Sequence, residues 1–278
     1  MSAMNDERLL SHLSTELSKV PGVRAIALGG SRARGTATQH SDYDLGLYYD
    51  GDNPLDTSAL MKTIARLDDA GPAASVTPIG GWGPWINGGG WLTVGGKRVD
   101  LLHRDLDRVR SVIGQCRAGQ IERHYQPGHP HAFVSAIYMG EVAYCQRLWD
   151  PSAILELLKH QTLPYPQPLR QGLIRTFLWE ARFAMENARH GRALDDVAYV
   201  AGCCFRSVAC LCQVLFAING TYLLNEKGAV LGTQLLMTCP NGFSARVASA
   251  LQQACNSHTA LAVRELLLLV EETEALAA

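Results

Sequence analysis

Two closely spaced aspartates are the residues of this sequence best suited to binding a metal ion and to catalysis. Asp42 and Asp44 stand two positions apart at the start of an apolar segment, residues 43–49, that is typical of a strand. Side chains at positions i and i+2 of a strand point to one face, so the two carboxylates are expected to lie together. A cation between them relieves their repulsion, and Mg²⁺ is commonly held by carboxylates together with substrate phosphates.

A third carboxylate is predicted on a neighbouring strand. Asp100 lies in the segment KRVDLLH, whose apolar residues also indicate a strand. Three carboxylates at one sheet edge are suited to two Mg²⁺ ions about 3.5–4 Å apart, which clamp the attacking and leaving oxygens of an in-line displacement.

A glycine turn precedes the aspartates. Gly29, Gly30 and Ser31 follow the apolar segment 23–28 and are predicted to form a sharp strand-to-helix turn. Glycine allows backbone N–H groups to approach a phosphate, a following helix N-terminus favours anions, and the Ser31 hydroxyl adds a donor. Arg32 and Arg34 flank the turn, either as phosphate ligands or as a solvated helix face.

The elements that position these residues indicate an α/β (α+β) fold with a small mixed sheet and helices packed on it. The patterns predict helices over 6–19, from 31 to about 34, from Pro54 or Asp56 to Ala70 and over 105–118, strands over 23–28 and 43–49, and a hairpin whose strands WLTV and KRVDLL are joined by Gly95–Gly96.

The second half of the sequence is predicted to be helical. A loop or linker is expected over 120–131, and only helices from about residue 132 onward, including 167–190, a helix capped by Asp195 or Asp196 that ends near Ile218, and helical sequence over 244–277. The predicted division is therefore an α/β domain over residues 1–120 and an all-α domain over 121–278.

Composition limits the classes of function. The formal net charge is −1, so no overall basic field predicts long nucleic acid as a partner. Apolar runs such as 197–218 are interrupted by Arg206 and Gln213, which predicts no membrane span. The N-terminal sequence lacks a signal-peptide pattern, and the eight cysteines have no CxxC spacing. We expect a cytoplasmic protein with reduced thiols.

The stretch LGGSRARGTATQHSDYDLGL, residues 28–47, resembles the signature of the nucleotidyltransferase superfamily typified by DNA polymerase beta. Its GGSxARG…SDxDL form is most similar to small bacterial members, among them aminoglycoside and lincosamide nucleotidyltransferases. The resemblance covers roughly the first 105 residues, and a following helical domain fits that architecture. TYLLNEKGAV, residues 221–230, also resembles a segment of bacterial relatives.

The resemblance implies roles for residues that match the signature. Asp42, Asp44 and Asp100 would bind two Mg²⁺ ions, and Gly29, Gly30 and Ser31 would hold the triphosphate of ATP or another nucleoside triphosphate. Arg34 is a further candidate for triphosphate binding. Lys227 is also a candidate for triphosphate binding, because a lysine of the helical domain has this role in some relatives. The alternative is that Lys227 is an ordinary surface lysine.

Other residues are candidates with a simpler alternative. Trp82, Trp85 and Trp91 either stack a base or an acceptor ring or, as we favour, cover the sheet edge. We interpret His124, His129 and His131 as loop histidines without suitable cysteine or carboxylate partners for zinc. Three glutamates on helices of the second domain are candidates for a general base, namely Glu141, Glu180 and Glu186.

The function expected from these features is Mg²⁺-dependent transfer of a nucleoside monophosphate, with AMP from ATP as first candidate, to a hydroxyl of a small molecule. Asp100 stands where several antibiotic-modifying relatives have a glutamate base, which weakens an antibiotic as acceptor. The alternatives are nucleotidylation of RNA ends or of a protein hydroxyl, as in toxin-like relatives, and nucleotide binding without catalysis, as in a sensor or antitoxin.

Overall fold

The computed structural model describes residues 5–192 and 196–278. The chain forms two compact units, and it passes between them more than once. The first unit contains the residues up to Gly114 together with Tyr138–Pro164, and the second contains Gln115–Ile137 and Tyr165–Ala278. The sequence predicts a single boundary at residue 120, whereas in the structure residues 138–164 return to the first unit.

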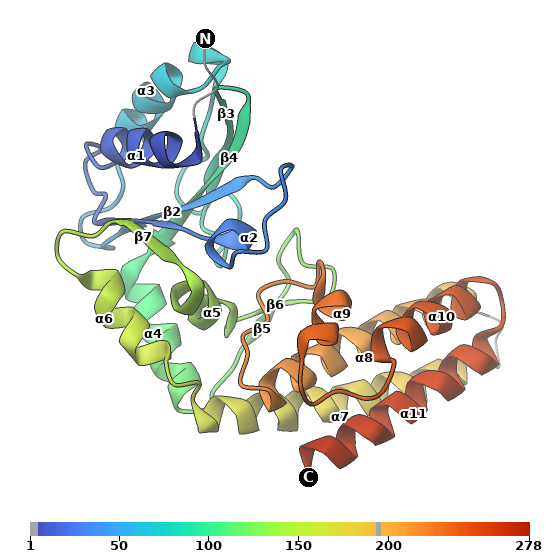
Figure 1. The fold of residues 1–278 in the computed structure, drawn as a ribbon. Helices are drawn as coiled ribbons and strands as arrows, with labels where there is room; N and C mark the ends of the chain where they lie inside the picture. The colour runs from blue at the N-terminus through green and yellow to red at the C-terminus, as the bar shows by residue number, and fades with distance from the viewer. Residues whose placement is uncertain (1–4, 193–195) are drawn as a thin grey trace. The chain divides into compact units, whose positions relative to one another are not determined.

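The first unit is built on a mixed five-stranded sheet with the strand order β3-β4-β2-β1-β7 (Figure 1). The strands are β1 (Ala25–Leu28), β2 (Tyr43–Tyr49), β3 (Gly89–Val94), β4 (Lys97–Asp105) and β7 (Gln146–Trp149). β2 and β4 are parallel, and the other neighbours are antiparallel. The predicted α/β class with a small mixed sheet is confirmed.

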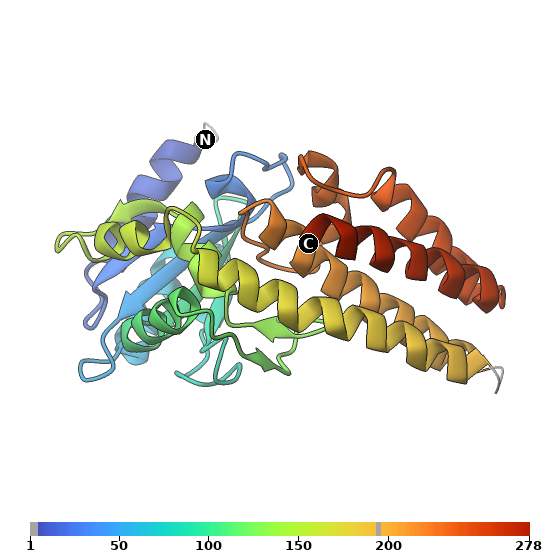
Figure 2. The ribbon, with the colours of Figure 1, turned by 90° about the horizontal axis from the view of Figure 1, so that it is seen from below.

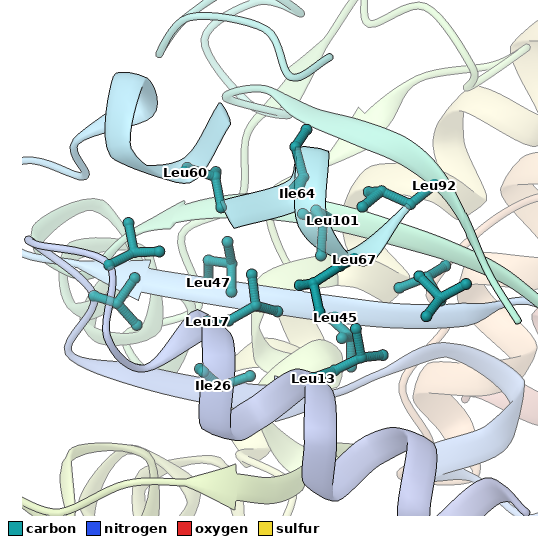
Figure 3. Packing of buried hydrophobic residues seen from close by; sticks show 14 of the residues in the cluster. Leu13, Leu17, Ile26, Leu45, Leu47, Leu60, Ile64, Leu67, Leu92 and Leu101 are labelled. Atoms are coloured by element: carbon teal, nitrogen blue, oxygen red, sulfur yellow. The ribbon is translucent and has the colours of Figure 1, made fainter. Parts of the chain in front are cut away.

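Two helices cover one face of this sheet and enclose its hydrophobic core. The helices are α1 (Asp6–Leu17) and α3 (Thr57–Leu67). Figure 3 shows Leu13 of α1 and Leu60 of α3 directed toward Leu45, Leu47 and the other buried strand residues. The Asp56 side chain accepts a hydrogen bond from the backbone N–H of Ala59 and caps α3, as its sequence predicts.

The predicted hairpin between β3 and β4 is present. Gly95 and Gly96 have φ values of +58° and +76°. Positive φ at both central positions is the requirement of a two-residue turn that matches the twist of the strands, and glycine meets it without steric cost. The hairpin sets the register that aligns Trp91 with Asp100.

The chain that follows residue 132 departs from the prediction of helices only, because it also contains strands. The remaining elements of the first unit are α2 (Gly30–Ala33), a 3₁₀ turn (Gly71–Ala73) and α6 (Ile154–Thr162), together with most of α4 (Leu106–Arg117) and of α5 (Ile137–Tyr144). After α5, β7 adds to the edge of the sheet by pairing antiparallel with β1. The strand was missed because its four residues, QRLW, carry no buried apolar pattern.

The second unit is mainly helical. Its long helices are α7 (Gln167–Arg192), α8 (Val197–Ile218), α10 (Phe243–Cys255) and α11 (Thr259–Ala277), and its short elements are α9 (Ala229–Gly232), a 3₁₀ turn (Thr233–Leu235), β5 (Arg123–His124) and β6 (Phe133–Val134). α7, α8 and α11 lie side by side in Figures 1 and 2. Asp196 caps α8 by accepting from the N–H of Tyr199, whereas Asp195 lies outside the described residues.

Among the described helices, α8 is long and apolar enough by length and composition to cross a membrane. This differs from the prediction made from the interruptions at Arg206 and Gln213. In the structure 61% of its most apolar window is buried. The core helix of a globular unit meets the same criterion, and α8 is packed on three sides by α7, α10 and α11.

A buried histidine in the first unit predicts acid sensitivity. His103 of β4 is 0% exposed, and neither ring nitrogen has a hydrogen-bond partner among the described residues. Burial, with a further contribution from the neighbouring charge of Arg104, lowers the pKa of His103 from 6.5 to about 4. Between these two pH values the unfolded chain binds a proton that the folded chain does not, so the free energy of unfolding falls as the pH is lowered.

The full effect over that range is roughly 3 kcal/mol. When the pH is lowered from 7 to 4.5, the free energy of unfolding of the parent should fall by about 2–3 kcal/mol more than that of His103→Leu. Urea unfolding at the two pH values measures this difference. Exposed His12 of α1 provides the matched control, since His12→Leu should leave the parent's pH dependence unchanged. Equal slopes for the parent and the His103 variant would contradict this explanation.

Candidate active site at the glycine turn and the carboxylate row

The turn between β1 and α2 is bonded to the strand that carries the aspartates. The backbone N–H of Gly29 donates to the carbonyl oxygen of Asp44 at 2.7 Å. Gly30 begins α2 with a φ of +61°, and a Cβ at this position would lie 1.8 Å from Asp44 Oδ2. The glycine therefore has a second purpose that the sequence did not reveal: it makes room for the Asp44 carboxylate.

The carboxylates are aligned across neighbouring strands. Asp44 of β2 and Asp100 of β4 are direct partners in the parallel register, so their side chains share one face of the sheet. Asp42 directly precedes β2, and its Oδ2 lies 4.0 Å from Arg98 Nη2. All three residues are half-buried. The predicted juxtaposition of Asp44 with Asp100 is therefore present in the structure.

This donor set fits divalent cations of the Mg²⁺ type. Carboxylate oxygens are the ligands that Mg²⁺ prefers, and the ion usually keeps sites open for waters and substrate phosphates. Two carboxylates on adjacent strands are about 5 Å apart at their backbones, a spacing at which a shared cation offsets their repulsion. A Cβ at Gly30 would overlap the Asp44 carboxylate, so the glycine allows that carboxylate to lie directly against the turn.

Arg32 holds the loop that presents Asp42. Its Nε donates to the Asp42 carbonyl oxygen at 3.0 Å and its Nη2 to the Ser41 carbonyl oxygen at 2.7 Å. The guanidinium also lies 3.7 Å above the Tyr43 ring and pairs with Asp6. These contacts favour positioning of the carboxylate over direct phosphate binding.

Arg34 has a looser setting than Arg32. It is exposed, and its Nε lies 3.4 Å from the Gly30 carbonyl oxygen, so its side chain begins beside the turn. Its assignment to the triphosphate stays a prediction. Lys227 lies in the second unit, where it is exposed and its backbone N–H donates to Asn225 Oδ1. Its assignment also stays a prediction.

A cleft of about 720 Å³ opens where β2 and β4 begin; Tyr43 and Lys97 are among its lining residues, whereas Asp42, Asp44 and Asp100 are not. Its lining includes three permanent cations and one carboxylate, namely Arg32, Lys97, Arg98 and Asp6. Lys97 Nζ lies 2.6 Å from Asp6 Oδ1, and Arg98 is largely exposed. The excess of positive charge favours an anionic ligand in this cleft.

The three tryptophans have different settings. Trp85 is buried, and its carbonyl oxygen accepts a hydrogen bond from the Tyr138 hydroxyl at 2.5 Å. Trp82 and Trp91 stack with ring centroids 4.7 Å apart, and Trp91 is 71% exposed. Trp85 therefore packs against α4 and α5, through Arg108 and Tyr138, and Trp91 leaves most of its surface in solvent.

Two of the three glutamates proposed as a general base, Glu141 and Glu180, are held in ion pairs. Glu141 lies on α5 of the first unit, not in the helical domain, and both of its oxygens accept from buried Arg104 at 2.7 and 2.9 Å. Glu180 is buried and paired with arginines, and Glu186 is exposed on α7. The assignment of Glu186 as a general base stays a prediction.

The prediction that His131 has no suitable cysteine or carboxylate partner is wrong. His131 Nε2 lies 3.2 Å from Glu180 Oε1 and 3.7 Å from Cys210 Sγ. The sequence did not reveal this cluster, because His131, Glu180 and Cys210 are far apart in the chain and are brought together only by folding. Burial raises the pKa of Glu180, but hydrogen bonds from His131 and Arg206 outweigh it and lower that pKa to about 2. The carboxylate charge is balanced by Arg206 and Arg123.

The other histidines of the loop are also paired. His124 Nε2 lies 2.8 Å from a Glu122 oxygen, and His129 Nδ1 lies 3.0 Å from a Glu226 oxygen. The other Glu226 oxygen accepts from the backbone N–H groups of His131 and Ala132. The segment around Glu226, which was noticed in the sequence for Lys227, thus fixes the histidine loop.

Comparison with known proteins places the turn and two of the aspartates in a described domain. Residues 10–76 match the family model of the nucleotidyltransferase domain. The matched residues of this nucleotidyltransferase domain include Gly29–Ser31, Asp42 and Asp44, and they end before Asp100. The finer resemblance to aminoglycoside and lincosamide enzymes stays a prediction.

A solved structure described as a nucleotidyltransferase-like protein from Exiguobacterium sibiricum is similar to this chain with 12% sequence identity. The similarity covers 96% of this chain and 75% of that one, with a TM-score of 0.44. A comparison with curated proteins gives no significant match.

Proposed function

We propose that this protein is a Mg²⁺-dependent nucleotidyltransferase that moves a nucleoside monophosphate from a nucleoside triphosphate to a hydroxyl of a small molecule. The observation that carries the proposal is the register of Asp44 with Asp100 beside the turn at Gly30, within and next to the matched nucleotidyltransferase domain. We take ATP as the first candidate donor and the cytoplasm as the place of action, in keeping with eight unpaired cysteines.

Each residue of the site has a proposed role in the transfer. Asp42 and Asp44 would hold two Mg²⁺ ions, and Asp100 would hold one of them and accept a hydrogen bond from the acceptor hydroxyl. The ions supply charge neutralisation at the attacking and leaving oxygens. Backbone N–H groups at Gly30 and Ser31 would bind the β- and γ-phosphates. The acceptor oxygen bonds the α-phosphorus while its proton passes along the hydrogen bond to Asp100, and the bond from the α-phosphorus to the bridging oxygen breaks to release pyrophosphate.

The acceptor proposed here is small because the formal net charge of −1 gives the chain no overall basic field of the kind that attracts long nucleic acid. The cationic cleft where β2 and β4 begin is of a size for a small molecule, and its charge favours one that carries negative charge. Labelled nucleotide that appeared on RNA or on protein in a lysate would instead favour the toxin-like alternative.

The first test is a thermal shift with each of the four nucleoside triphosphates, with and without Mg²⁺. A ligand that binds only the folded state stabilises it by about 2.7 kcal/mol at 100 times its dissociation constant, a shift of several degrees. We expect a Mg²⁺-dependent shift that is lost in the Asp42→Asn/Asp44→Asn double variant. Exposed Asp52 supplies the control, because Asp52→Asn should keep the shift. No shift with any nucleotide would overturn the proposal.

A further inference from the structure

A stacked pair of indole rings, of which one is largely exposed, lies at the edge strand of the sheet. Trp91 of β3 is 71% exposed, and the alternate residues Leu92 and Val94 are buried in the core. Trp82 stacks on it with an angle of 30° between the rings. Leaving most of an indole in water forgoes roughly 1.5–3 kcal/mol of burial, so a ring held in this state requires an explanation.

The position of Trp91 supplies one. Trp91 is the direct register partner of Asp100, and Asp100 is the direct partner of Asp44. Directly opposed residues on neighbouring strands point to the same face, so the three side chains form one row across β3, β4 and β2. With about 5 Å between strands, the Trp91 backbone lies roughly 5 Å from that of Asp100 and roughly 10 Å from that of Asp44.

The loop that carries Trp82 is fixed to the sheet. The Thr77 N–H donates to the Gly89 carbonyl oxygen at 2.8 Å, and the Gly89 N–H returns a bond to Thr77 Oγ1 at 2.9 Å. Gly89 has no side chain where a Cβ would lie 2.8 Å from the Trp82 ring, so the ring packs against the strand backbone. Buried Trp85 anchors the loop through the hydrogen bond from Tyr138. The indole pair is thus pre-organised.

We propose that Trp91, supported by Trp82, is the surface on which the base of the nucleoside triphosphate stacks. This inference rests on the proposed function, because the triphosphate must be held at the carboxylate row for its base to reach β3. Stacking on an aromatic ring is open to every base, since each has a π face, and it favours the larger purines. The ring accordingly adds affinity for any nucleotide and a moderate preference for ATP and GTP.

The test compares ATP with inorganic tripolyphosphate, which has the phosphates and no base, in the presence of Mg²⁺. Dissociation constants measured by calorimetry should favour ATP by about 10-fold or more in the parent protein, and Trp91→Ala should remove most of that preference. Trp91→Phe should restore part of it. Trp179, exposed at 64% and stacked on Phe183 in the second unit, gives the matched control Trp179→Ala, which should bind as the parent does.

The outcomes separate this inference from the proposed function. If the parent binds neither ATP nor tripolyphosphate with Mg²⁺, the proposed function fails. If the parent prefers ATP and Trp91→Ala keeps the full preference, the stacking inference is wrong while the proposed function stands. Because Trp91 is exposed, unfolding of the variant is not expected, and its melting temperature without ligand verifies this point.

Discussion

Replacement of Asp44 by asparagine is expected to reduce nucleotidyl transfer by at least about 10³-fold while the protein stays folded. Asn keeps the shape of the side chain but removes the negative charge, so the residue no longer balances a divalent cation. Asp44 is half-buried at the end of β2, and its carbonyl oxygen still accepts from Gly29 in the variant because that bond involves only the backbone. Asp42→Asn should have an effect of the same order.

The measurement is pyrophosphate release from each nucleoside triphosphate in the presence of a metabolite extract, together with Mg²⁺-dependent nucleotide binding. Asp44→Asn should lose both. Asp100→Asn should lose pyrophosphate release but keep much of the nucleotide binding, because its assigned partner is the acceptor side of the site. Transfer at the parent's rate by Asp44→Asn would exclude the carboxylate row as the active site.

The sequence was most informative where local rules decide the structure. The Gly95–Gly96 turn, the Asp56 cap and the strand over residues 43–49 each follow from a few neighbouring residues, and the structure has them as predicted. The turn at Gly29–Gly30 followed by Asp42 and Asp44 belongs to the same class. A short motif whose chemistry depends on spacing along the chain can be recognised without any knowledge of the tertiary structure.

The sequence was least informative where folding joins distant residues. β7 pairs with β1 across more than a hundred residues, and the pairing is made by backbone atoms that leave no side-chain pattern. For the same reason Glu141 was assigned to the helical domain, although it pairs with Arg104 of β4. The alignment of Trp91 with Asp100 also depends on strand register, which the hairpin turn sets and which no composition argument supplies.

A methyl group at Gly30 is expected to disable the site as thoroughly as the loss of the Asp44 charge. The φ of +61° costs an alanine there about 1 kcal/mol, which most domains tolerate. The decisive effect is steric, because the added Cβ would lie 1.8 Å from Asp44 Oδ2 and 2.7 Å from its Cγ. The carboxylate must turn away from the place it shares with Asp100, and Mg²⁺-dependent nucleotide binding should then fall by at least about 100-fold.

The matched control is Gly35→Ala. Gly35 has a φ of +70°, nearly the same as that of Gly30, but a Cβ there would meet no atom within 4 Å. Both variants therefore carry the same backbone cost, and only Gly30→Ala displaces the carboxylate. Thermal melts should show similar destabilisation of the two proteins, while nucleotide titrations should separate them. If Gly35→Ala lost binding to the same extent, backbone strain in the loop rather than crowding of Asp44 would be the cause, because the two glycines differ in this contact and not in their φ.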